Sequence, residues 1–342
     1  MSDLNNKNQK PEVEQVEKEE KKPLATGQRN LSKKEIRNLS GKNREGVFAR
    51  MSASEIVFKV ISYVILTIFA LICLYPFIYV LSGAITSKES LDQGQLVLFP
   101  IGFQIDALKG VFTSKSFWIA YSNAIFITLF GTIYSMGISI LAAYSLSKTR
   151  MFGHKFFNFI LVFTMWFSAG MIPVYLNYTD TKRILANIGI TDTKWLIVLA
   201  MGFSAYNVII LRNAFQAVPK EIEEAALVDG ANDSQILTKV FVPMSKASVA
   251  TVALFYGVSR WNGYFWARQM ADPTLDAPLQ VAIRIWLETI VDSDYISTWN
   301  ETYSYNSYTY AMVVCAIVPI LIIYPFIQKY FAAGVNLGGV KE

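Results

Sequence analysis

Hydrophobic residues are gathered in six long runs that carry almost no charged side chains. The runs cover Val60–Ser87, Ser116–Ser147, Phe156–Thr179, Trp195–Leu211, Ala247–Ser259 and Thr302–Gln328. A helix needs ~20 mostly apolar residues to cross the hydrocarbon core of a bilayer. The fifth run is interrupted by Arg260 but continues through the sequence WNGYFWA. The pattern therefore predicts an all-α membrane protein with six transmembrane helices.

The composition agrees with this class. Of the 342 residues, 53% are hydrophobic and the mean hydropathy is positive, which is too apolar for a single soluble core. The two cysteines, Cys73 and Cys315, lie inside hydrophobic runs, so a disulfide scaffold and a cysteine zinc site are excluded. The single histidine, His154, stands in a basic loop without a catalytic or ligand partner nearby. No metal site is predicted, because such sites need three or four convergent ligands.

The N-terminal residues 1–55 have a different character from the remainder, 56–342, which is predicted to be the transmembrane domain. Between Lys21 and Lys59 there are ten basic residues and three acids. A long charged segment of this kind predicts a disordered tail that stays in the cytoplasm beside anionic lipid headgroups. No aromatic residues interleave with the basic ones, so nucleic-acid binding is not expected. A signal peptide is not expected either, because the basic region is too long and no cleavage site follows.

Charge in the loops predicts the orientation. The loop 147–155 carries three basic residues and no acid, whereas the predicted loop Arg268–Tyr308 carries two basic residues and six acids. The positive-inside rule then puts the first loop inside and the second outside, with both termini in the cytoplasm. The loop 212–246 also faces the cytoplasm in this arrangement, although it holds four basic residues and five acids. A loop that departs from the charge rule is expected to have a role of its own.

That loop contains the sequence EEAALVDGANDSQILTKVFVP, which is too polar for a membrane span. Read as a helix, it places Glu221, Glu224, Ala225 and Val228 on one face. The alanines keep this face thin enough to enter a groove, and Glu224 offers a carboxylate to a basic partner. A solvated loop with ordinary caps is the alternative, but the cluster of acids and alanines favours a docking helix.

Residues that end and begin helices follow this face. Gly230 suits a left-handed helix end, and Asn232, Asp233 or Ser234 can cap a second helix. Pro243 is expected to end that second helix before the fifth crossing. The stretch is therefore predicted to be a helix–turn–helix.

The same stretch resembles the EAA signature of binding-protein-dependent ABC importer permeases. Glu224-Ala225-Ala226 is followed by Gly230 and then by Val240, Val242 and Pro243, with valines where the family pattern has isoleucine and leucine. LYPFIYVLSGAIT, NAIFITLFGTIYSMGISILAAYSLSKTRMFG, DPTLDAPLQVAIR and the tail QKYFAAGVNLGGVKE also resemble the carbohydrate branch, of the maltose-system second-permease type. Within that branch, permeases for polysaccharides and aldouronates look most similar.

The resemblance implies a type I ABC importer permease fold and a set of partners. A second permease would complete the translocation pathway, two ATP-binding subunits would supply energy, and an extracytoplasmic solute-binding protein would deliver an oligosaccharide. The chain would be a multi-pass protein of the bacterial plasma membrane that holds no cofactor, since ATP would be bound by its partners. It would not itself be an enzyme.

The resemblance also implies roles for particular residues. In the loop 212–246, from here on called the EAA loop, the residues expected to couple ATPase and permease are Glu224, Ala225, Ala226, Asp229, Gly230, Ala231 and Pro243. Gly338 and Gly339 in the C-terminal tail are candidates for a second ATPase contact, and a frayed terminus is the alternative. The loop Arg268–Tyr308 is expected to contact the binding protein.

Four residues near the end of the fifth run are candidates for the substrate path: Tyr256, Arg260, Trp261 and Asn262. Aromatic rings stack on sugars, although Trp and Tyr also form interfacial belts. A guanidinium within a span is costly unless it reaches the headgroups or faces a wet cavity. Two readings of Arg260 therefore stay open: it snorkels to the outer interface, or it faces the pathway and binds a uronate carboxylate.

Three other functions compete with this interpretation. A secondary transporter or channel would usually show intramembrane ionisable groups or internal repeats, and Arg260 is the one candidate. A membrane scaffold would have no use for an acidic docking helix. An ABC permease for a non-sugar solute is disfavoured by the DPTLDAPLQ segment, through resemblance. No Walker-type phosphate loop is present in the sequence.

Overall fold

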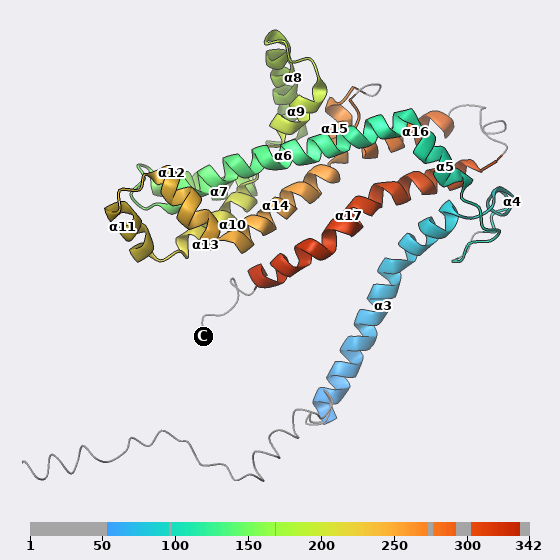
Figure 1. Ribbon diagram of the computed structural model, residues 1–342, viewed down its shortest axis with the longest axis horizontal. Helices are drawn as coiled ribbons and strands as arrows, with labels where there is room; N and C mark the ends of the chain where they lie inside the picture. Colours follow the sequence, from blue (N-terminus) through green and yellow to red (C-terminus); the bar gives the residue numbers. More distant parts are fainter. Residues whose placement is uncertain (1–52, 96–97, 168, 273–275, 292–301, 336–342) are drawn as a thin grey trace, which may run out of the picture. The chain divides into compact units, whose positions relative to one another are not determined.

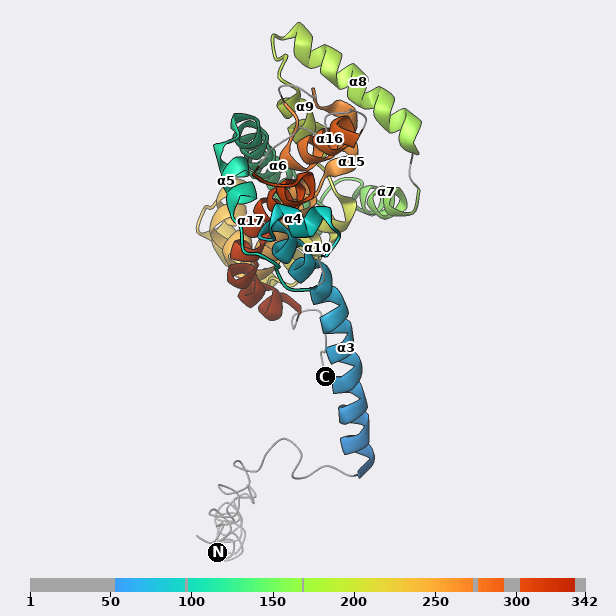
Figure 2. The same cartoon turned by 90° about the vertical axis from the view of Figure 1, so that its right-hand side faces the viewer.

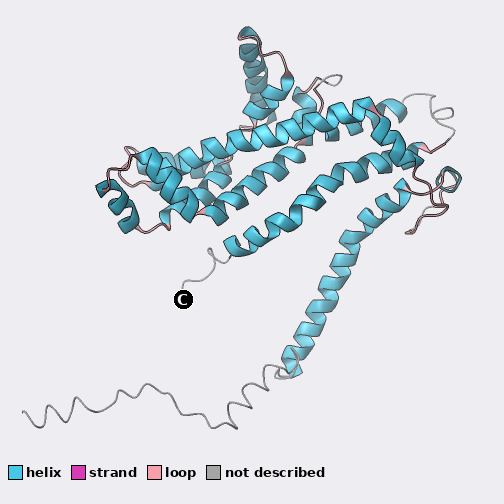
Figure 3. Cartoon of the chain, viewed as in Figure 1, coloured by secondary structure: helices cyan, strands magenta, loops and turns pink. Residues whose placement is uncertain are grey.

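The computed structural model describes residues 53–95, 98–167, 169–272, 276–291 and 302–335. These residues are almost entirely helical, with one isolated bridge between Thr86 and Phe103 among them (Figure 3). The chain divides into two units, 1–72 and 73–342. The predicted tail 1–55 lies almost wholly outside the described residues.

Among the described residues, three helices are long and apolar enough to cross a membrane by themselves. They are α3 (Ala53–Ala84), α6 (Lys115–Ser147) and α17 (Tyr305–Val335), and each covers most or all of one predicted run. The side chains of α3 are mostly exposed, as expected for a helix that faces lipid. Two short helices, α4 (Lys88–Asp92) and α5 (Asp106–Thr113), connect α3 to α6.

The other three predicted spans are broken helices. One consists of α7 (His154–Trp166) and α8 (Met171–Asn187). Another consists of α9 (Thr193–Ala200) and α10 (Ala205–Gln216), which meet at an angle of 51°. The last is α14 (Lys246–Trp261), which covers the fifth predicted run and bends by 87° from Asp233–Met244, the helical segment that ends the EAA loop. With each pair taken as one span, the described residues hold up to six crossings, as the sequence predicts.

Helix α6 organises the core. It packs against α14, α10 and α9, and α14 packs in turn against α17 (Figure 1). One hydrophobic cluster, which includes Phe117, Ile197 and Met312, surrounds one half of α6. A second cluster, which includes Val208, Phe215 and Val252, surrounds its other half. The EAA loop adjoins the second cluster through Ile236 and Phe241.

The segment Arg268–Tyr308, predicted as a loop, is partly helical. It contains the end of α15 (Tyr264–Met270) and the whole of α16 (Leu279–Val291), which lies beside α15 (Figure 2). Leu279, Ala282 and Ile283 are buried on one side of α16. This i, i+3, i+4 spacing is that of an amphipathic helix packed on the core. The sequence analysis treated this segment only as an acidic, aromatic connection between two spans and did not predict α16. Residues 273–275 and 292–301 are outside the described residues.

The EAA loop itself begins at the end of α10. It continues through α11 (Lys220–Val228), α12 (Asp233–Ile236), one π-helical element η1 (Leu237–Phe241) and the short α13 (Val242–Met244). The helix–turn–helix prediction is confirmed.

Candidate functional site

The docking face predicted for α11 is open to its surroundings. Glu221, Glu224, Ala225 and Val228 are all exposed, and Val228 is 88% exposed. The opposite side of the helix includes Glu223 and Ala226, which are partly buried. Helix α11 therefore presents two carboxylates and two small apolar side chains together, with no covering from the described residues.

The end of α11 has a specific backbone geometry. Asp229 is the C-cap, and Gly230 has a φ of +79°, in the left-handed region that favours glycine. The amide of Gly230 donates to the carbonyl of Leu227 at 3.0 Å, and the amide of Ala231 donates to the carbonyl of Ala226 at 3.0 Å. These two bonds make a Schellman motif, so the predicted role of Gly230 as a helix end is confirmed.

Of the three residues that the sequence offers as a cap for the second helix, Asn232 is the one that caps it. The Asn232 side chain accepts from the amide of Gln235 at 2.9 Å, and the Gln235 side chain accepts from the amide of Asn232 at 3.0 Å. This reciprocal pair is a capping box. It fixes the point at which the chain turns from α11 into α12.

Pro243 was expected to end the second helix, but the helix continues past it by one residue. The helix continues to Met244 and ends at Ser245, where the chain bends by 87° into α14. Proline has no amide to donate and its ring crowds the carbonyl four residues earlier, here Lys239. Lys239 belongs to the π-helical element, whose wider turn accommodates such a mismatch.

The EAA loop is joined to the end of α6 by a shielded ion pair. Lys148 Nζ lies 2.6 Å from Glu223 Oε2, and the two side chains are only 10% and 17% exposed. The same ammonium lies over the rings of Phe241 at 3.8 Å and Tyr144 at 4.6 Å. Lys148 thus contacts α11 and η1 simultaneously. Burial lowers the pKa of Lys148, and the hydrogen bond and charge of Glu223 act against this.

A second ion pair supports the first. Arg150 Nη2 lies 2.5 Å from Asp233 Oδ1 at the start of α12, and the Tyr144 hydroxyl donates to the same oxygen at 3.2 Å. Sequence reasoning missed both pairs. The signal was present, since the acid-free loop 147–155 and the acid-rich EAA loop were predicted to lie on the same side of the membrane.

Tyr256 and Arg260 lie in the interior of the chain. They are 3% and 5% exposed. The Arg260 guanidinium donates to the carbonyls of Ile197 and Val198, at 2.7 and 3.1 Å, and to Ser135 Oγ at 2.9 Å. Neither reading of Arg260 from the sequence describes this site, because the cation neither reaches outward nor faces a cavity. Only the position of backbone carbonyls in the folded chain could have shown it.

Trp261 and Asn262 have different surroundings. Trp261 donates from its indole to the carbonyl of Ala316 at 3.2 Å and borders an apolar groove between α6, α14 and α17. Tyr121, Thr128 and Tyr324 also line this groove. Asn262 is exposed and ends α14, where its carbonyl accepts from the amide of Tyr264 at 2.7 Å. The four candidates for a substrate path therefore do not converge on one surface.

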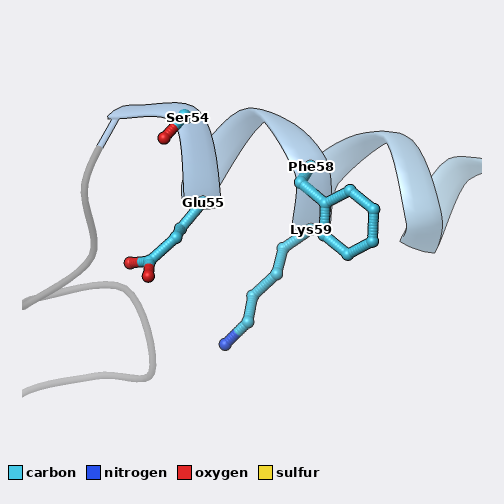
Figure 4. Close-up of a pocket in the computed structure, with 4 residues that line it drawn as sticks. All are labelled: Ser54, Glu55, Phe58 and Lys59. Atoms are coloured by element: carbon cyan, nitrogen blue, oxygen red, sulfur yellow. The ribbon is translucent and has the colours of Figure 1, made fainter.

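The remaining candidates contribute less. Gly338 and Gly339 lie outside the described residues, beyond the end of α17. Ser54, Glu55, Phe58 and Lys59 line a pocket on the first turns of α3 (Figure 4), which combines the start of a helix with one acid and one base. In the described part of the chain no three His, Cys, Asp or Glu side chains are grouped as metal ligands would be.

The comparisons with known proteins agree with one another. The sequence model for the family described as "Binding-protein-dependent transport system inner membrane component" matches residues 135–337. The Bacillus subtilis (strain 168) polygalacturonan/rhamnogalacturonan transport system permease protein YtcP is 36% identical over 290 residues, which are 83% of this chain and 98% of that protein. Protein LplC of the same organism is 34% identical over 290 residues, 83% of this chain and 95% of that protein.

A solved structure extends the likeness to three dimensions. It is the crystal structure of a bacterial ABC transporter involved in the import of the acidic polysaccharide alginate. One of its chains is 39% identical to this one, with a TM-score of 0.75, and the match covers 82% of this chain and 99% of that chain.

Proposed function

Since the chain belongs to the family of binding-protein-dependent transport system inner membrane components, we propose that it is the permease subunit of an ATP-driven oligosaccharide importer. The family membership confirms the resemblance seen in the sequence. The all-α membrane fold with up to six crossings is confirmed as well. The proposal adds a coupling role for the EAA loop, a class of substrate and a set of partners.

The observation that carries the coupling role is the open face of α11. Glu221 and Glu224 are exposed while Glu223, between them, is paired within the chain. A helix that pairs one carboxylate within its own chain and leaves two exposed can dock into a basic groove on another protein. We assign that groove to an ATP-binding subunit, with Glu224 and Ala225 at the contact. Ala226, which packs on the second hydrophobic cluster instead, shapes the loop together with Asp229, Gly230, Ala231 and Pro243.

The substrate class rests on the relatives. One relative is named for the transport of polygalacturonan and rhamnogalacturonan, and the solved transporter imports an acidic polysaccharide. An oligosaccharide that contains uronic acids is therefore the first substrate to test. Because the Arg260 cation is occupied by backbone carbonyls, it does not select such a substrate. Recognition is left to the solute-binding protein and the partner permease.

The assembly proposed has one further permease, two ATP-binding subunits and one solute-binding protein, in a bacterial plasma membrane. Both termini and the EAA loop lie in the cytoplasm, where ATP is bound and hydrolysed by the partner subunits. A secondary transporter is disfavoured, because the buried Arg260 donates to backbone and serine oxygens and is not placed to bind a coupling ion.

The test is co-purification and uptake with the partner subunits. The wild-type assembly in vesicles should import a uronate oligosaccharide only when ATP and the binding protein are both present. Glu224→Lys should release the ATP-binding subunits, because a charge-assisted contact becomes a repulsive one. Lys182→Glu, a charge reversal at an exposed residue of α8, is the control and should retain them. ATP-independent uptake, or full ATPase retention by the Glu224 variant, would contradict the proposal.

A further inference from the structure

The fourth span is interrupted at residues 201–204, between α9 and α10. A helix that ends leaves carbonyls without intrahelical partners, and one that begins leaves amides without them. Within a membrane such groups are costly, and irregular backbone survives only where neighbouring protein satisfies it. The residues that supply these bonds therefore decide whether the break persists.

Helix α14 supplies bonds on both sides of the break. On the α9 side, Arg260 donates to the carbonyls of Ile197 and Val198 at 2.7 and 3.1 Å. On the α10 side, the Tyr256 hydroxyl accepts from the amide of Ser204 at 3.1 Å. Tyr256 and Arg260 are four residues apart, so they lie on the same face of α14. One helix face thus holds the two ends of the interrupted span.

Helix α6 completes the same network with two serines at the same spacing. Ser135 Oγ accepts from Arg260 at 2.9 Å, and Ser139 Oγ lies 2.6 Å from the Tyr256 hydroxyl. Both serines are fully buried. One turn before Ser135, Gly131 lets the arginine stem pass, since a Cβ there would lie only 3.0 Å from Arg260 Nε. The break is therefore bonded to α14 and α14 is bonded to α6.

Helix α14 also connects this network to the EAA loop. It begins at Lys246, directly after the bend at Ser245 that ends the loop. Arg260 lies 14 residues further on, which is ~21 Å at ~1.5 Å per residue. A displacement of the EAA loop that moves α14 must therefore also move the broken fourth span, or break these bonds.

We propose that Tyr256 and Arg260 are positioning residues for transport, which hold the break between α9 and α10 to α14 so that α6, α9 and α14 move as one block. The role rests on the proposed function, because it concerns how movement of the EAA loop reaches the rest of the subunit. It concerns no contact with the substrate. If Arg260 were needed only for folding, its substitution would not change the uptake per ATP hydrolysed of complexes that assemble correctly.

The first experiment measures the network without reference to transport. Amide hydrogen exchange is followed in the assembled transporter in nanodiscs, for peptides that cover residues 201–208. Tyr256→Phe removes the acceptor of the Ser204 amide while keeping the ring, so exchange there should rise by about fivefold or more. Tyr206→Phe is the matched control, because Tyr206 lies in α10 with an exposed side chain, and its exchange should equal that of the wild type.

The second experiment measures coupling. Gly131→Ala brings a Cβ to 3.0 Å from Arg260 Nε, so the arginine side chain must shift by a few tenths of an ångström, whereas Gly137→Ala on the same helix meets nothing within 4 Å. With the complex assembled and basal ATPase activity retained, Gly131→Ala and Tyr256→Phe should each lower uptake per ATP hydrolysed by about threefold to tenfold, as expected for one weakened bond. Gly137→Ala should match the wild type. Arg260→Lys should keep more of the coupling than Arg260→Met, because an ammonium still donates to carbonyls.

Each outcome decides the proposal. Unchanged exchange in Tyr256→Phe would show that the hydroxyl does not hold the break. Increased exchange with normal uptake per ATP would show that the network is structural only. A wild-type complex that imports no saccharide would overturn the proposed function, and the exchange result would still report on the network.

Discussion

Lys148, at the end of α6, and Glu223, in α11, form an ion pair of 2.6 Å that is largely shielded from solvent. Glu223 stands directly beside Glu224, which is exposed. Two neighbouring carboxylates thus have opposite orientations, one toward α6 and one toward the surroundings. The inward carboxylate fixes the helix, and the outward one is free of contacts with α6. Substitutions of the two residues should therefore have different effects.

Breaking the inward pair should loosen the EAA loop. Lys148→Met should cost about 1–3 kcal/mol of stability, less than the ~3–5 kcal/mol typical of a fully buried pair, because the two side chains keep some exposure to solvent. Loss of the contacts with Phe241 and Tyr144 is included in this cost. A thermal denaturation series of the purified subunit measures this. The exposed pair Asp106–Lys109 is the control, and Asp106→Asn should change stability far less than Lys148→Met, because solvent screens exposed pairs. Equal effects in the two pairs would show that shielding does not matter here.

Exchanging the two charges gives a sharper test of the same pair. Lys148→Glu and Glu223→Lys should each be destabilising, while the double variant should recover part of the loss, since an ion pair is restored without the original ring contacts. The coupling energy comes from a double-mutant cycle. Strictly additive effects would mean that the two residues do not interact.

Gly230 should tolerate substitution poorly for a backbone reason. Its φ is +79°, yet a Cβ built there would meet nothing within 4 Å. Gly230→Val should therefore cost about 1–2 kcal/mol through strain alone, and Gly230→Asn should cost less, because asparagine tolerates this conformation. ATPase association and denaturation of the assembled complex measure the effect. If Gly230→Asn were as destabilising as Gly230→Val, backbone strain would not be the cause and a steric clash would be indicated instead.

Asp276 should anchor the first turn of α9. Its Oδ2 accepts from the amide and the hydroxyl of Thr193, at 3.0 and 2.9 Å. Asp276→Ala removes both bonds and a negative charge at a helix start, so a loss of about 1–2 kcal/mol is expected. Asp180→Ala, at an exposed acid of α8, is the control and should be near neutral. Hydrogen exchange at residues 193–196 should rise only in the first variant.

The C-terminal residues offer a test that spares the helices. Helix α17 ends at Val335, so removal of residues 336–342 leaves it intact. If the tail reaches the ATP-binding subunits, the truncated chain should bind them more weakly or alter their hydrolysis rate, as measured by co-purification and ATPase assays. Unchanged binding and rate would identify the tail as a frayed terminus.

The sequence alone determined the parts of this protein that depend on neighbours along the chain. Hydrophobic run length predicted six crossings, and the residues around Gly230 and Asn232 predicted a helix end and the start of a second helix, both of which the structure contains. These features follow from local backbone geometry and from the length of chain needed to cross a bilayer. The family could be recognised from the EAA stretch for the same reason, since its spacing is local.

The tertiary structure decided which side chains meet. The buried position of Arg260 depends on carbonyls that become available only because α9 stops at Ala200, and nothing in the run around Arg260 signals that break. Helical spacing already put Glu224 and not Glu223 on the docking face, but only the approach of Lys148 from α6 shows that Glu223 is paired within the chain. Each of these depends on contacts between distant segments, which a one-dimensional pattern does not contain.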